Sequence, residues 1–248
     1  MRARHHTIVA AATVVAFAVL LTAPLRGECE EGARGTATPG ATPSPAATHV
    51  PFAATSTHPF DDAKYWSSIF DDPARDAWQK PADVVAALGL RSGMVVADLG
   101  AGTGYFSRYL SAAVGERGTV FAVETEPNLV AHLRARAERE HTANVTPVLA
   151  SFDDTRLPAA SVDVVLIVDT YHHLDARLGY LTRLRRALKP HGRIAIVDWQ
   201  ATPLPVGPPM EHKLAREQVI AEMQAAGYRL VAAPPILPYQ YVLVFEAP

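Results

Sequence analysis

Cysteine is almost missing from the sequence, since Cys29 is the only one among 248 residues. A single cysteine excludes an internal disulfide framework, and it also excludes a pair of closely spaced cysteines that would bind zinc. One cysteine does not indicate whether the protein works in an oxidising or a reducing compartment. The HHLD stretch at residues 172–175 has no further clustered ligand at a recognisable spacing, so we predict no metal site.

An excess of charge of either sign is also missing. The chain carries 23 Lys and Arg against 25 Asp and Glu, which gives a formal net charge of -2. It has no long basic run and no stripe of alternating aromatic and basic residues, and this argues against nucleic acid as a partner. At this length we expect one domain of ordinary size with appendages.

Two common nucleotide-binding signatures are missing as well. No Gly-Lys-Ser/Thr follows the glycines at residues 100–104, which excludes a phosphate-binding P-loop. A dinucleotide fingerprint GxGxxG would place its third glycine at position 105, where the chain has Tyr105. Nicotinamide-dependent redox chemistry is therefore disfavoured.

What the chain does contain is an apolar strand that breaks into glycines, because residues 95–107 read VVADLGAGTGYFS. The apolar start suits a buried parallel strand, and a helix-compatible pattern resumes after the third glycine. Such a turn exposes unpaired backbone N–H groups and lets a ligand approach without interference from Cβ. We therefore predict a cofactor cradle, with an ordinary glycine-rich turn as the alternative. Its members are Asp98, Gly100, Ala101, Gly102 and Gly104.

A second acidic position follows at the end of the next apolar run. Residues 118–124 read GTVFAVE and predict a buried strand that ends in Glu124, about 20 positions after the glycines. A carboxylate at that place can accept hydrogen bonds from both hydroxyls of a ribose. We predict Glu124 as the ribose ligand, and the alternative is a solvated glutamate at a strand end.

The N-terminal part has a different composition from the rest. Residues 1–27 combine a basic start with an apolar block, which predicts a secretory signal or a membrane anchor. Residues 28–60 are rich in Ala, Thr and Pro without hydrophobic periodicity, so we expect a disordered linker. The globular domain is expected over residues 61–248. Its first part, residues 61–81, is aromatic and predicts short helices over one edge.

Two later motifs complete the pattern. Leu157-Pro158 ends a predicted loop at residues 151–158, and a Leu-Lys-Pro-x-Gly turn ends at Gly192. Together with DLGAGTG and Glu124, these motifs resemble those of class I S-adenosylmethionine-dependent methyltransferases of the methyltransferase-11 or ubiquinone-biosynthesis type. The segment AWQKP at residues 77–81 and the Tyr171-His172 pair resemble bacterial relatives within that group. The resemblance covers the chain from about residue 61 onward.

The resemblance implies an α/β fold of the Rossmann-like type and a cofactor. The expected sheet has seven mostly parallel strands in the order 3-2-1-4-5-7-6, with helices on both faces. S-adenosylmethionine would lie across the carboxyl ends of the strands, where open α/β sheets bind ligands. The NPPY-like motif of amino-group methyltransferases of DNA and glutamine is absent, because residues 169–172 read DTYH.

The resemblance also assigns further site residues. In the loop after the third strand it implies Asp153 for the adenine amino group, with Asp154 as an alternative and Phe152 stacking on the ring. It places Trp78 and Lys80, together with Gln79, at the methionine end. After the fourth strand it implies a methyl-transfer site with Asp169 or His172 as the base and Tyr171 shaping the pocket, against the alternative that the His pair merely caps a helix.

Three functions are open at this point. The leading one is methyl transfer from S-adenosylmethionine to a small-molecule acceptor. The second is a tethered module that binds S-adenosylmethionine or a related nucleoside without catalysis, and nicotinamide chemistry is the third. The N-terminus predicts an exported or membrane-anchored protein, with the bacterial periplasm as its compartment, or a cytoplasmic protein if the start codon is misplaced. Export would separate the domain from the cytosol, where the cofactor is made.

Overall fold

The computed structural model describes residue 60 and residues 62–248. The predicted signal or anchor at residues 1–27 and the linker up to residue 59 therefore lie outside the described residues. Among the helices that are described, none is both long enough and apolar enough to cross a membrane.

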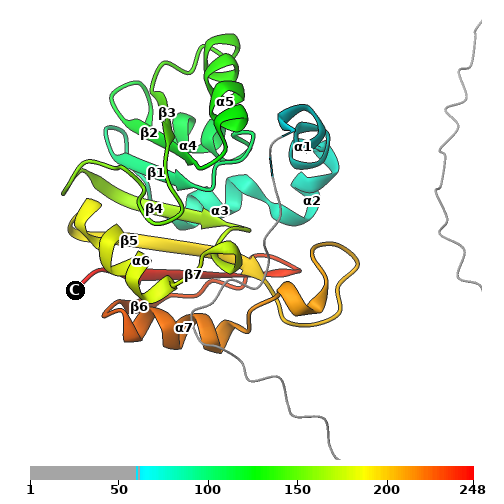
Figure 1. Cartoon of the computed structure of the whole chain (residues 1–248), viewed down its shortest axis with the longest axis vertical. Coiled ribbons are helices and arrows are strands. Elements are labelled where there is room, and N and C mark those ends of the chain that lie inside the picture. Colours follow the sequence, from blue (N-terminus) through cyan, green and yellow to red (C-terminus); the bar gives the residue numbers. More distant parts are fainter. Residues whose placement is uncertain (1–59, 61) are drawn as a thin grey trace, which may run out of the picture. The chain divides into compact units, whose positions relative to one another are not determined.

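One seven-stranded sheet forms the centre of the described chain (Figure 1). Its order is β3-β2-β1-β4-β5-β7-β6, as the resemblance implied. All neighbouring strands run parallel except that β7 is antiparallel to both β5 and β6. The strands are β1 (Val95–Leu99), β2 (Thr119–Glu124), β3 (Val145–Leu149), β4 (Val162–Val168), β5 (Leu188–Trp199), β6 (Arg229–Ala232) and β7 (Gln240–Glu246).

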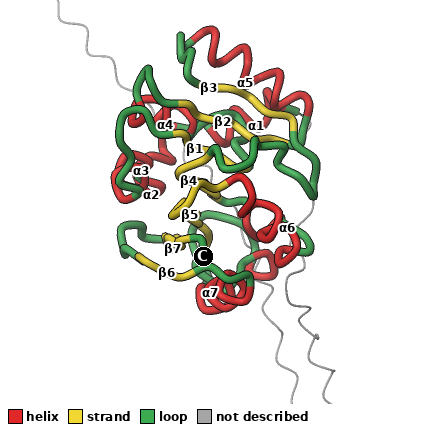
Figure 2. Tube along the Cα trace, turned by 90° about the vertical axis from the view of Figure 1, so that its left-hand side faces the viewer, coloured by secondary structure: helices red, strands yellow, loops and turns green. Residues whose placement is uncertain are grey.

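Helices cover both faces of the sheet, which explains why its central strands are apolar throughout. In β4, Val165 and Ile167 pack into the core under α6 and α7, whereas Val164 and Leu166 pack into the core under α3 and α4. Figure 2 shows α3 and α4 on one side and α6 on the other. A parallel strand that is buried on both faces needs a nearly continuous hydrophobic run. The helices are α1 (Ala63–Phe70), α2 (Asp76–Gln79), α3 (Pro81–Ala87), α4 (Ser107–Val114), α5 (Pro127–Arg139), α6 (Arg177–Leu184) and α7 (Arg216–Ala225), with short 3-10 helices at Pro73–Arg75, Tyr171–His173, Arg185–Ala187 and Met210–His212.

The predicted turn at residues 189–192 is a bulge inside β5. Leu188 already pairs with Val162, and the next pair joins Arg193 to Val164, so the intervening residues of β5 loop out of the ladder. A Cβ on Gly192 would lie 2.8 Å from the Lys189 carbonyl oxygen, which explains the glycine. Further along, a 3-10 helix at Met210–His212 precedes α7, which begins at Arg216.

The aromatic segment before the core folds as the predicted short helices. Residues 63–79, which we call the cover segment, contain α1, the 3-10 helix at 73–75 and α2. In Figure 1 they lie to the right of the sheet, on the side toward which β4 points. No residue of α1 is buried, yet Trp66, Ile69 and Phe70 line the cleft described below. The cover segment therefore presents its apolar side chains to a cleft.

Candidate active site

A cleft of about 1120 Å³ opens at the carboxyl ends of the parallel strands. Its lining includes the glycine-rich loop after β1, the end of β2, the residues after β4 and part of the cover segment. This is the place where open α/β sheets bind ligands. The volume slightly exceeds the roughly 300–1,000 Å³ of common ligand pockets, so the cleft has room for a cofactor and a small acceptor.

The glycine-rich loop approaches its surroundings too closely for side chains. Gly100 has φ +74°, and a Cβ there would collide with the Thr170 side chain that follows β4. Gly102 has φ +57° and faces the Phe70 ring of the cover segment. Both glycines line the cleft together with Ala101, and Gly104 follows in the same loop. Backbone without side chains therefore lines the cleft here. Its N–H groups are not unpaired as predicted, because those of Gly100 and Ala101 donate to the Val123 carbonyl oxygen and that of Gly102 donates to Glu124.

Glu124 lies at the end of β2 and reaches across to this loop. Its Oε1 accepts a hydrogen bond of 2.7 Å from the Gly102 N–H, and its Oε2 accepts one of 2.9 Å from the Thr125 N–H. Burial raises the pKa of Glu124, although these hydrogen bonds from the backbone oppose the shift. The acid and the glycine loop thus meet in one place, at the end of β2.

Asp98 closes β1 and lies at the base of the same region. Its carboxylate accepts a hydrogen bond of 2.6 Å from the Ser107 hydroxyl at the start of α4. Burial raises the pKa of Asp98 to about 6, the Ser107 hydrogen bond opposes the shift, and the nearby charge of Glu124 adds to it. Asp98 therefore joins the strand to the helix beside the cleft.

Asp169 begins the other half of the cleft, directly after β4. It has φ +53°, in the left-handed region, and its Oδ2 pairs with the Arg75 guanidinium at 3.1 Å. Burial raises the pKa of Asp169 to about 6, while the charge of Arg75 opposes the shift and that of Asp198 adds to it. This carboxyl is thus poised to titrate close to neutral pH.

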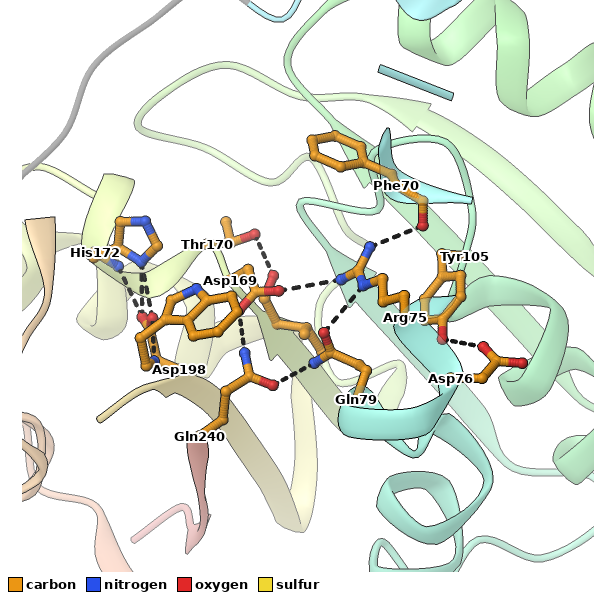
Figure 3. A network of polar contacts seen from close by, with 12 residues as sticks. Phe70, Arg75, Asp76, Gln79, Tyr105, Asp169, Thr170, His172, Asp198 and Gln240 are labelled. Carbon is orange, nitrogen blue, oxygen red and sulfur yellow. Dashed lines mark hydrogen bonds and ion pairs between the residues drawn. The ribbon is translucent and has the colours of Figure 1, made fainter. Parts of the chain in front are cut away.

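A closed ring of hydrogen bonds holds Asp169 in place (Figure 3). Arg75 donates through Nε to Gln79 at 3.0 Å, and the Gln79 amide donates to Gln240 at 2.6 Å. Gln240 then donates to the second oxygen of Asp169. The four side chains come from the cover segment, from β7 and from the turn after β4. The ring therefore ties the cover segment to the sheet.

His172 lines the cleft one turn further along and pairs with Asp198 at the end of β5. Its Nδ1 lies 2.9 and 3.0 Å from the two Asp198 oxygens, and both side chains are buried. Burial by itself lowers the pKa of His172, but the Asp198 carboxylate outweighs it and the net pKa is raised. A carboxylate beside Nδ1 favours the tautomer that carries its proton on that nitrogen.

Aromatic side chains form much of the remaining lining. Trp66 stacks on Phe70 with a centroid distance of 5.0 Å, and Trp78 packs on Trp199 at 5.2 Å. All four line the cleft. The half of the cleft near His172 and Trp199 is consequently suited to an apolar or planar ligand.

Four of the predicted site residues are not part of the cleft lining. One is Gly104, where a Cβ would lie 2.9 Å from the Leu133 side chain. Tyr171 is fully buried on the far side of the turn, where its hydroxyl donates to Glu222 at 3.0 Å, so it does not shape the cleft. Lys80 is exposed and its Nζ donates to the Ile236 carbonyl at 3.3 Å, away from the cleft lining. Asp153 accepts from Ser151 at 2.9 Å and is not part of the lining either. Phe152 stands at the rim, 82% exposed.

Several residues of the site escaped the sequence analysis. Arg75, Asp198 and Gln240 carry no motif, and their partners lie 94, 26 and 71 positions away in the chain. The cover segment was expected to fold over one edge of the domain, but nothing in its sequence indicated that an arginine would line the cleft.

Within the described residues, no group of three or more His, Cys, Asp or Glu is arranged to hold a metal ion.

Comparison with known proteins agrees with this geometry. Residues 96–192 match a family model described as a methyltransferase domain. A demethylmenaquinone methyltransferase of Lactococcus lactis subsp. lactis (strain IL1403) is 26% identical over 140 residues, 56% of this chain and 55% of that protein. One of Staphylococcus aureus (strain MRSA252) is 31% identical over 143 residues, 56% of each chain. The chain thus spans about half the length of the curated relatives it matches.

Among solved structures, a SAM-dependent methyltransferase from Aquifex aeolicus superposes with a TM-score of 0.72 and is 29% identical. The match covers 75% of this chain and 99% of that one. The fold and the matched domain imply S-adenosylmethionine as the cofactor.

The residues in the cleft fit that group. Backbone without side chains lines the cleft at Gly100 and Gly102, and Glu124 offers acceptor oxygens beside it. The volume of about 1120 Å³ is sufficient for the nucleoside and the amino acid portion together.

Proposed function

We propose that this chain, a class I S-adenosylmethionine-dependent methyltransferase by its fold and by its matched domain, transfers a methyl group to a small-molecule acceptor bound in the aromatic half of the cleft. The observation that carries the proposal is the continuity of the cleft. One cavity is lined by Gly102 and Glu124 at one end and by His172 and Trp199 at the other. A cofactor and an acceptor can therefore lie side by side without a barrier between them.

The residues have distinct tasks in this proposal. The cofactor, when bound, supplies a methyl group already activated on a positively charged sulfur. The glycine loop admits the nucleoside to the backbone, and Glu124 accepts hydrogen bonds from the ribose hydroxyls. The aromatic side chains exclude water and hold the acceptor in line with the methyl group, because displacement depends chiefly on positioning.

His172 is the residue that takes a proton from the acceptor. Asp198 holds the proton on Nδ1, orients the ring and stabilises the protonated imidazole, so that Nε2 acts as the base. Asp169 lies nearby, but its oxygens are already engaged by Arg75 and Gln240. The acceptor is thus a molecule that loses a proton, at the methylated atom or at a group conjugated to it, when it is methylated.

The test uses the full chain and S-adenosylmethionine with a radiolabelled methyl group, screened against small molecules that carry such groups. We expect label in at least one acceptor. His172→Asn should then lower turnover by about 10²–10⁴-fold while cofactor affinity stays unchanged, because general base catalysis contributes that much. His191→Asn is the matched control, since His191 is 87% exposed in the β5 bulge.

Cofactor binding without transfer to any acceptor would contradict the proposal and favour the non-catalytic binding module, which none of the relatives reported above supports. Equal losses of turnover in both histidine variants would remove His172 from the reaction.

Export or anchoring through residues 1–27 is a separate proposal that rests on the basic and apolar composition of that stretch. Fractionation of a C-terminally tagged protein, with its N-terminus sequenced, tests it.

A further inference from the structure

Arg75 is the only arginine or lysine among the described residues that line the cleft. Every other fully charged side chain there is acidic. The acidic residues in the lining are Asp98, Glu124, Glu126, Asp169 and Asp175. A carboxylate that entered this cleft would be repelled along most of its length and attracted at one position.

The Arg75 side chain is held rigidly at that position. Its guanidinium lies over the Tyr105 ring, 4.4 Å from the centroid, and only 13% of the side chain is exposed. Besides its bonds to Gln79 and Asp169, it donates through Nη1 to the Phe70 carbonyl at 3.0 Å. These three bonds use three of the five N–H groups of a guanidinium. A planar donor that is fixed in this way is pre-organised to bind a carboxylate.

The charge of Arg75 also reaches the base of the cofactor region. Its charge opposes the rise that burial causes in the pKa of Asp98, which lies beside the glycine loop, and in the pKa of Asp169. The cleft therefore offers one cation between two acids. An amino acid group carries the complementary charges, an anionic carboxylate next to a cationic ammonium.

We propose that Arg75 binds the carboxylate of the methionine portion of S-adenosylmethionine and so fixes the end of the cofactor opposite the ribose. This inference rests on the proposed function, because it assumes the same cofactor. It replaces Lys80, which the sequence placed at the methionine end but which bonds to the Ile236 carbonyl outside the cleft. In this arrangement the cover segment both encloses the cofactor and recognises its charge.

The experiment is calorimetric titration of the full chain with two ligands that differ only in the carboxylate, S-adenosylmethionine and its decarboxylated analogue. The wild type should bind S-adenosylmethionine roughly 10-fold to 100-fold more tightly, as expected for hydrogen bonds to a charged group. Arg75→Gln should lose most of this preference while its affinity for the decarboxylated analogue stays within about 2-fold. Arg75→Lys should retain part of it, because the charge remains.

Arg108→Gln is the matched control. Arg108 also lies over the Tyr105 ring, 5.1 Å from its centroid, but does not line the cleft, so both affinities should stay at wild-type values. Equal weakening of both ligands in Arg75→Gln would show a purely structural role and overturn the inference. The inference would also be overturned if the wild type bound both ligands with equal affinity. This result does not depend on whether the Arg75→Gln variant folds. A wild type that binds neither ligand would instead overturn the proposed function.

Discussion

Two arginine–carboxylate pairs in this chain use the same chemistry for different ends. Arg177 and Glu222 join α6 to α7 away from the cleft, with a forked pair of contacts at 2.7 and 2.9 Å and side-chain exposures of 0% and 4%. Arg75 and Asp169 make a single contact at 3.1 Å in the cleft, with exposures of 13% and 23%. The first pair makes two hydrogen bonds away from the cleft, whereas the second makes one contact between two residues that line the cleft.

The acids of the two pairs titrate in opposite directions. Burial raises the pKa of both, but in Glu222 the hydrogen bonds from Arg177 and Gln218 outweigh it and hold the pKa below the usual value. In Asp169 burial prevails and the pKa rises to about 6. The two hydrogen bonds from Arg177 thus stabilise the charged form of Glu222 more than the single contact with Arg75 stabilises that of Asp169.

The largest expected effect tests the structural pair. Arg177→Met leaves a buried Glu222 carboxylate without its cation, so the free energy of unfolding should fall by about 3–5 kcal/mol. Urea unfolding of the full chain measures it. Arg75→Gln serves as the control and should cost no more than about 1–2 kcal/mol. If the two substitutions destabilise the protein equally, the contrast between the pairs is wrong.

A smaller effect concerns the pH dependence of stability. Because the pKa of Asp169 is raised from 3.8 to about 6 in the folded state, the folded protein holds this proton more tightly than the unfolded chain. Stability from this group is therefore present at low pH and is lost as the pH rises from about 4 to about 6.

Asp169→Asn removes that dependence. The stability of the variant relative to the wild type should rise by about 1–3 kcal/mol between pH 4 and pH 7, because Asp98 titrates alike in both proteins and cancels. Unfolding curves recorded at several pH values give the difference. A constant difference across that window would mean that Asp169 keeps an ordinary pKa.

The smallest effect concerns an acid that has no guanidinium partner in the described contacts. Glu124→Ala should weaken the binding of S-adenosylmethionine by at least roughly 1.5 kcal/mol, because the proposed hydrogen bonds to the ribose are lost. Calorimetric titration measures the affinity. Lys80→Ala is the control and should bind as the wild type does, since Lys80 does not line the cleft. Unchanged affinity in Glu124→Ala would remove Glu124 from the site.

The sequence predicted the part of the site that is built locally. The glycine loop follows β1, and Glu124 is the last residue of β2. Because β1 and β2 are parallel neighbours, the carboxyl ends of the two strands lie side by side. The strand order followed from the family resemblance. The structure confirms the strand order and the contact between the glycine loop and Glu124, while the cofactor roles of these residues stay predictions.

The other half of the site depends on pairings across the chain. Gln79 and Gln240 are 161 positions apart and meet because β7 inserts beside β5, which no local pattern specifies. Tyr171 was assigned to the wrong side because the 3-10 turn after β4 decides which residue of the Tyr-His pair faces the cleft. The turn points His172 into the cleft and Tyr171 to Glu222 in the core.

The contribution of β7 to the hydrogen-bonded ring has a consequence for biosynthesis. A ribosome synthesises Arg75, Gln79 and Asp169 well before it reaches Gln240, which lies at the start of the last strand. The ring around Arg75 can therefore close only when synthesis is almost complete.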